Sequence, residues 1–80
     1  MELNKLTVHH YADNANEEKR ITLSPQNIVV AAAAIEDTQV NGRSVRNVTV
    51  LFVDGGSIDL VVNHSDLEMI EQAVGTYYFG

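Results

Sequence analysis

The feature that most constrains the fold is a long β-type segment, Val45 to Val53, with a glycine turn on each side. Large apolar side chains recur at every second residue from Val48 to Phe52, the period of a half-buried strand. Asn41-Gly42 precedes the segment and is a strong hairpin signal, because a type I′ turn needs positive φ at both central residues. Asp54-Gly55-Gly56 follows, and glycine there adopts a left-handed conformation without steric cost. The pattern predicts an antiparallel strand with a hairpin at each end.

The segment before this strand is ambiguous. Residues Ile28 to Ile35 contain four alanines, which favour a helix, and four β-branched residues, which favour a strand. A strand over Ile28–Thr38 would pair through the Asn41-Gly42 turn, and we expect that arrangement. A helix over Pro25–Asp37 is the alternative.

The N-terminal region alternates less regularly. Leu3–His10 is predicted to be a strand in which Leu6 and Val8 point to one face. The polar stretch Ala12–Arg20 is expected to be a loop, followed by a short extended piece to Leu23. Pro25 restricts Ser24 to extended geometry and suits the first position of a helical turn.

The C-terminal region predicts a strand and then a helix. Ile58, Leu60 and Val62 alternate with more polar residues, as in a half-buried strand. Ser65 and Glu68 have the spacing of a capping box, which predicts a helix that begins there and ends before Gly75. At helical spacing, its expected core-facing residues are Leu67, Ile70, Ala73 and Val74.

Together these elements predict one small α+β domain over residues 1–80. We expect an antiparallel meander of about four strands with the C-terminal helix packed on one face. A chain of 80 residues buries only about 60% of its unfolded surface, so its stability is marginal without disulfides, metals or partner chains.

Composition excludes several classes. The chain has no cysteine, so disulfides and thiolate zinc sites are excluded. Its apolar runs are shorter than the roughly 18 residues of a membrane span, and its N-terminus lacks a secretory pattern, so we expect a cytoplasmic protein. His9 and His10 point to opposite faces of a strand and His64 is distant in sequence, so no metal or cofactor is expected.

No motif supports an enzyme. Asp54 fits a turn, Asp66 and Glu68 fit the helix start, and Glu71 fits an exposed helix face. Only Asp59 lacks a structural reason, whereas acid–base catalysis needs two opposed carboxylates. Each of the serines Ser44, Ser57 and Ser65 lies at a turn or cap without a nucleophile elbow.

The charge distribution disfavours direct binding to nucleic acid. Eleven acidic and five basic residues give a formal charge of −6. All the bases lie at or before Arg46, and the remainder of the chain holds five acids. Binding to phosphates needs clustered Lys and Arg. An acidic surface could contact a basic protein partner, but maintaining solubility is the simpler interpretation.

An excess of apolar strand surface is the main functional signal. One helix cannot cover both faces of the predicted sheet, and an uncovered apolar face usually marks an interface. Aromatic residues such as those of the C-terminal tail are enriched at interfaces. We therefore expect a non-catalytic protein–protein interaction module that forms a homodimer or higher oligomer, of the kind found among small bacterial or phage accessory proteins. The expected interface residues are Leu51, Val53, Val61, Tyr77, Tyr78 and Phe79.

A binding protein for an anionic metabolite or nucleotide is the alternative. Arg43 and Arg46 lie close to the Asn41-Gly42 turn, where guanidinium groups could bind phosphate or carboxylate. Tyr77 and Tyr78 could add stacking contacts at a subunit interface.

Overall fold

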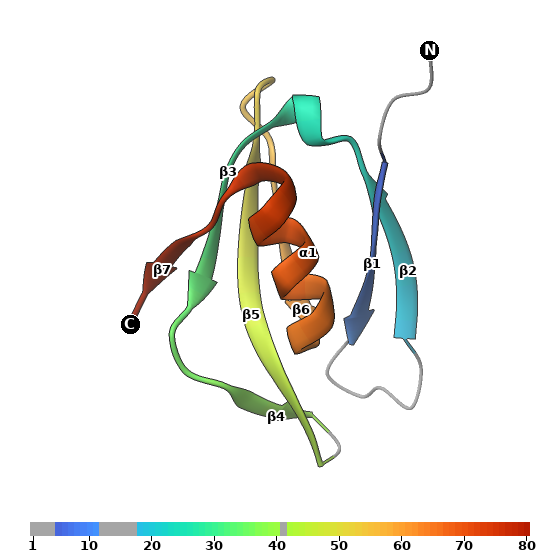
Figure 1. Cartoon of the computed structure of the whole chain (residues 1–80), viewed down its shortest axis with the longest axis vertical. Coiled ribbons are helices and arrows are strands. Elements are labelled where there is room, and N and C mark those ends of the chain that lie inside the picture. The colour runs from blue at the N-terminus through green and yellow to red at the C-terminus, as the bar shows by residue number, and fades with distance from the viewer. Residues whose placement is uncertain (1–4, 12–17, 41) are drawn as a thin grey trace.

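The computed structural model describes residues 5–11, 18–40 and 42–80 (Figure 1). These residues form an α+β fold with mostly antiparallel strands and one C-terminal helix, as predicted. The elements in chain order are β1 (Leu6–Tyr11), β2 (Glu18–Leu23), a short 3-10 turn (Pro25–Asn27), β3 (Ile28–Ala34), β4 (Thr38–Val40), β5 (Arg43–Phe52), β6 (Ser57–Val62), α1 (His64–Val74) and β7 (Tyr77–Phe79).

Strand β5 is the centre of the main sheet. It pairs with β6 along one edge and with β3 and β4 along the other, always antiparallel. Val48 lies opposite Leu60 of β6 and Ala33 of β3, so the apolar residues of the three strands share one face. This is the face that the alternation in the sequence predicts. Gly55 closes the β5–β6 hairpin with φ 95°, whereas Asn41 of the other turn lies outside the described residues.

The predicted meander of four strands is wrong in number and direction. The described chain has seven strands, and β7 pairs with β3 in parallel, which makes the main sheet mixed. In this parallel pair Tyr77 lies opposite Ala32, which is 45 residues earlier in the sequence. No local sequence pattern encodes a pairing over that separation. Strands β1 and β2 form a separate two-stranded sheet (Figure 1).

Strand β3 settles the ambiguity between helix and strand. The helix expected as the alternative over Pro25–Asp37 is wrong, because Ile28–Ala34 pairs with β5. Ala31 and Ala33 are fully buried at 0% exposure, and the small side chains allow the helix layer to approach the sheet closely. The predicted strand was too long, since it stops at Ala34 and pairing resumes only in β4.

The N-terminal hairpin corrects the expected loop. Glu18–Arg20 belong to β2, which pairs with β1 from Leu6 opposite Leu23 to Tyr11 opposite Glu18. Leu6 and Val8 are buried as predicted, while residues 1–4 and 12–17 lie outside the described part. Ser24 is extended and Pro25 opens the 3-10 turn, which confirms that prediction.

Helix α1 begins earlier than the predicted capping box. Asn63 is the N-cap, and its side-chain oxygen accepts a hydrogen bond from the Asp66 amide at 2.8 Å. The expected cap at Ser65 is therefore wrong, since Ser65 already lies within the helix. Ala73 is exposed rather than core-facing. Gly75 ends the helix with φ 77°, as predicted.

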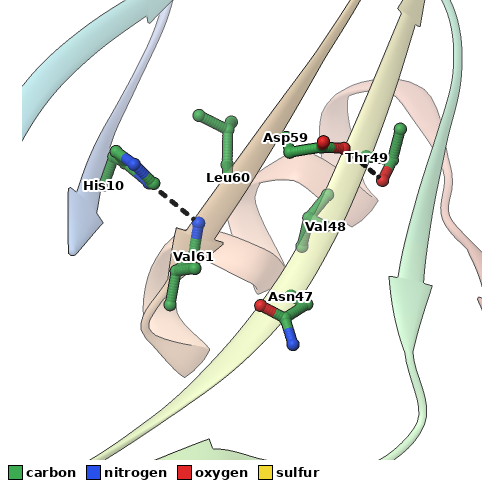
Figure 2. Close-up of a pocket in the computed structure, with 7 residues that line it drawn as sticks. All are labelled: His10, Asn47, Val48, Thr49, Asp59, Leu60 and Val61. Carbon is green, nitrogen blue, oxygen red and sulfur yellow. Dashed lines mark hydrogen bonds between the residues drawn. The ribbon is translucent and has the colours of Figure 1, made fainter. Parts of the chain in front are cut away.

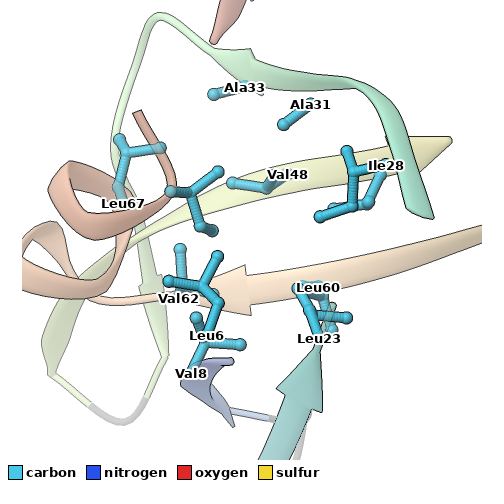
Figure 3. Close-up of a cluster of buried hydrophobic side chains, with 12 residues drawn as sticks. Leu6, Val8, Leu23, Ile28, Ala31, Ala33, Val48, Leu60, Val62 and Leu67 are labelled. Atoms are coloured by element: carbon cyan, nitrogen blue, oxygen red, sulfur yellow. The ribbon is translucent and has the colours of Figure 1, made fainter. Parts of the chain in front are cut away.

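The core lies on one side of the main sheet. Both α1 and the β1–β2 hairpin contribute to it, so the layers are the sheet on one side and these elements on the other (Figure 1; Figure 3). The buried cluster comprises Leu6, Val8, Leu23, Ile28, Ala31, Ala33, Val48, Val50, Leu60, Val62, Leu67 and Ile70.

The two candidate caps give a direct test of this helix start. Replacing Asn63 by Ala removes the cap and also the hydrogen bond that the Asn63 side-chain Nδ2 donates to the Tyr11 hydroxyl at 3.1 Å. We expect Asn63→Ala to lower the free energy of unfolding by about 1 kcal/mol. The matched control Ser65→Ala, at an exposed helical position, should change it by less than about 0.5 kcal/mol. Urea unfolding followed by circular dichroism measures both, and a larger loss for Ser65→Ala would contradict this assignment.

Candidate functional site

The face of the main sheet that points away from α1 has no helix or strand over most of it within residues 5–11, 18–40 and 42–80. We call it the open face. The strand registers of β6, β5, β3 and β7 place its residues side by side. Ala32 of β3, for example, lies between Thr49 of β5 and Tyr77 of β7. The open face consists of Val30, Ala32, Ala34, Asn47, Thr49, Leu51, Ser57, Asp59, Val61, Tyr77 and Phe79.

Polarity changes across the open face. The β6 side is polar, and the Thr49 hydroxyl donates a hydrogen bond to the Asp59 carboxylate at 2.8 Å. The opposite side is apolar, because the short side chains of Ala32 and Ala34 lie beside Tyr77 and Phe79. Of the two sides of the open face, the aromatic side is therefore better suited to contact a protein partner.

Strand β7 divides the aromatic tail between two sides of the sheet. Tyr77 and Phe79 are on the open face and are 70% and 46% exposed. Tyr78 lies opposite Ala33, a core residue, so it points to the helix side. Partial desolvation and the neighbouring Glu71 carboxylate raise the pKa of Tyr78 above its ordinary value of 10.0. The Tyr78 phenol is therefore neutral at physiological pH.

Two hollows adjoin the open face. One, of about 420 Å³, lies beside β5 and β6 and is lined by residues that include His10, Asn47, Thr49 and Asp59 (Figure 2). His10 Nδ1 accepts a hydrogen bond from the Val61 amide at 2.9 Å, so a neutral His10 carries its proton on Nε2. The other, of about 210 Å³, is mainly apolar and lies beside Phe79 and Ile35.

The corner near the start of β5 is covered by β1. Tyr11 is buried, and the Arg43 guanidinium lies 4.8 Å from the centre of its ring. Val45, two residues after Arg43 on β5, is 0% exposed. The open surface is therefore concentrated at the far side of the face, toward β3 and β7.

The expected interface residues are not all equivalent. Leu51 is on the open face and is 42% exposed, and Val53, just beyond β5, is 64% exposed. Val61 is only partly exposed and lies in the hollow that His10 borders. Sequence reasoning grouped these residues by apolar character, but only the registers show which of them adjoin the aromatic side.

The residues expected to bind an anion are held by separate partners. Arg43 lies over the Tyr11 ring, whose hydroxyl accepts a hydrogen bond from the Asn63 side chain. Arg46 donates from Nε and Nη2 to one oxygen of Asp37, at 3.0 and 2.8 Å. Tyr78 shares the helix side with Arg46, whereas Tyr77 is on the open face.

Asp37 ties together three elements. The same carboxylate oxygen that binds Arg46 lies 2.9 Å from His64 Nε2, at the start of α1. Hydrogen bonds from Arg46 and His64 hold the pKa of Asp37 below its ordinary value of 3.8. The cluster joins the β3–β4 connection, β5 and α1.

The sequence did not predict that the buried Asp66 carboxylate links two elements of the fold. Asp66 is 5% exposed, and its Oδ2 accepts a hydrogen bond from the His9 amide at 2.7 Å and lies 3.1 Å from His9 Nδ1. This contact fastens β1 to the start of α1. The sequence showed only an acid in the first helical turn, because the partner is 57 residues away. Within the described residues, no three His, Cys, Asp or Glu side chains gather as metal ligands.

Comparison with protein-family models, with curated proteins and with solved structures gives no significant match. Among the described residues, none of the helices has the length and apolar character needed to cross a membrane.

The Asp37 cluster predicts a pH dependence. Because the native pKa of Asp37 is depressed, its ionised form stabilises the fold above the ordinary value of 3.8, and this contribution is lost as the pH falls through the lower native value. We expect Asp37→Asn to reduce the loss of unfolding free energy on acidification from about pH 5 to about pH 3. Glu68→Gln, at an exposed position of α1, is the control. Equal acid sensitivity of Asp37→Asn and the unmodified protein would contradict this role.

Proposed function

We propose that the protein is a non-catalytic, cytoplasmic interaction module that self-associates along the aromatic side of the open face, with Tyr77 and Phe79 in the contact. The observation that carries the proposal is the position of these two side chains. They protrude from an edge strand at the apolar side of a face that α1 does not cover. A second copy offers the same surface, which is what a symmetric homodimer requires.

Burial of these groups would favour association. A tyrosine or phenylalanine buries about 150–250 Å² when covered, at roughly 25 cal/mol per Å² of apolar area. Ile35, which is 54% exposed and lies beside Phe79, extends the apolar surface. The formal charge of −6 opposes association of two copies, so added salt should strengthen it by screening.

The non-catalytic part of the proposal is supported by the hydrogen bonds that the titratable side chains make with one another. Asp66 and His9 bind one another, and Asp37 binds Arg46 and His64. These bonds join separate elements of the fold, which gives the groups a structural explanation. Asp59 accepts from Thr49 on the same sheet.

Binding of a small anion is the second candidate. The observation that favours it is that Arg46 and Tyr78 lie on the same side of the sheet, opposite the core residues Val62 and Ala33 respectively. An anion would have to displace Asp37 from the guanidinium. A thermal-shift screen of nucleotides would support it through a stabilisation that Arg46→Ala abolishes while the protein stays folded.

Self-association is tested by molar mass in solution, from light scattering during gel filtration. We expect the mass to rise from 8.8 kDa toward twice that value with increasing concentration. Tyr77→Glu places a charge in the contact and should weaken association by about tenfold or more.

The control for this test is Met69→Glu. Met69 is a 41% exposed apolar residue of α1, away from the open face, so its replacement should leave association unchanged. A constant mass of 8.8 kDa for the unmodified protein up to about 1 mM would overturn the proposal.

A further inference from the structure

We propose that two copies associate edge to edge, through antiparallel pairing of β7 with β7 of the second copy about a two-fold axis at Tyr78. This inference rests on the proposed self-association and specifies its geometry. The result would be one continuous sheet through both copies, with the two open faces side by side.

The hydrogen bonds of β7 carry the argument. The Phe79 carbonyl accepts from the Ile35 amide at 2.8 Å, so the backbone groups of Phe79 point toward β3. In a parallel pair, alternate residues direct both their N–H and C=O to the same neighbour. Tyr77 therefore also points toward β3, and the backbone N–H and C=O of Tyr78 point outward, to the edge where no described strand lies.

The side chains of β7 are complementary to themselves in this arrangement. With Tyr78 opposite its own copy, two backbone hydrogen bonds form between the two Tyr78 residues. Tyr77 then lies opposite Phe79 of the second copy, and Phe79 opposite its Tyr77, both on the open face. All three directly opposed pairs are aromatic, and such pairs stabilise strand pairing. A two-fold axis produces all of them at once.

The edge lacks most of the usual protection against pairing. Natural edge strands are shielded by short length, lysine, proline, bulges or a covering segment, and β7 has only the first of these, with three residues. Strand β7 is Tyr-Tyr-Phe with none of these residue types, and all three side chains are exposed. One acid and one base, Glu71 and Arg46, act on Tyr78 from the same chain, so the axis does not gather charges of a single sign.

The exposed area sets the expected strength. At 70%, 41% and 46% exposure, the three aromatic side chains offer about 300 Å² per copy. A standard interface buries about 800 Å² per partner. We therefore expect a weak dimer whose population rises between about 10 μM and 1 mM.

Amide hydrogen exchange tests this geometry in the unmodified protein. The Tyr78 amide should exchange more slowly as the protein concentration rises through the range in which the mass increases. The Phe79 amide, which points toward β3, should be protected at all concentrations and serves as the internal control.

Paired variants give an independent test. Tyr78→Pro removes the outward N–H without removing a bond of the β3–β7 ladder, whereas Tyr78→Ala removes the same ring and keeps the N–H. We expect Tyr78→Pro to weaken association by at least about tenfold more than Tyr78→Ala does. Leu51→Glu, two strands away from the edge, should associate like the unmodified protein.

The outcomes separate the two proposals. Association that persists in Tyr78→Pro but is lost in Leu51→Glu, with a Tyr78 amide indifferent to concentration, would show face-to-face stacking. That result overturns edge pairing and leaves self-association standing. A protein that is monomeric at about 1 mM overturns both.

Discussion

The structure depends on the fact that one short helix covers only one of the two faces of the sheet. Helix α1 has 11 residues, and its buried Leu67 and Ile70 reach only one side of β3, β5 and β6. The β1–β2 hairpin completes that same side with Leu6, Val8 and Leu23. Every covering element therefore serves one core, and the opposite face is left with a mixture of polar, aliphatic and aromatic residues, Leu51 and Tyr77 among them. The single-sided core is the reason that one face of the sheet remains exposed.

Two polar joints keep the covering elements in place. Asp66 fastens β1 to the start of α1, and Asp37 fastens β5 and His64 to the β3–β4 connection. Both joints are centred on carboxylates that receive several N–H groups, which makes each bond stronger than a neutral one. Because these joints hold the helix over one face, they also determine which face remains open.

Local patterns predicted the parts of the fold that local chemistry controls. Alternation from Val48 to Phe52, the glycine turn at Gly55 and the helix end at Gly75 are all observed. The misses share a different cause. Pairing of Tyr77 with Ala32, and of Asp66 with His9, joins residues distant in sequence, which no short window contains. The cap was misplaced because Ser65 and Glu68 match the capping-box spacing, while Asn63 two residues earlier forms the cap.

The same limit applies to the candidate site. Apolar surplus and aromatic character indicated Leu51, Tyr77, Tyr78 and Phe79 as surface groups, and each is exposed. The sequence could not show that Tyr78 points away from Tyr77 and Phe79, because the side of each residue depends on the register with β3. The division of the tail between two sides is a property of the parallel pairing.

The central proposal is that the exposed Tyr77 and Phe79 rings are shielded from water only by contact with a second copy. Relaxation of the Tyr77 and Phe79 ring protons by a water-soluble paramagnetic probe, measured over a dilution series, tests it most directly. We predict strong relaxation in dilute solution and protection as the concentration rises. Rings that stay protected at every dilution would show that the chain covers this surface itself, and would contradict the account.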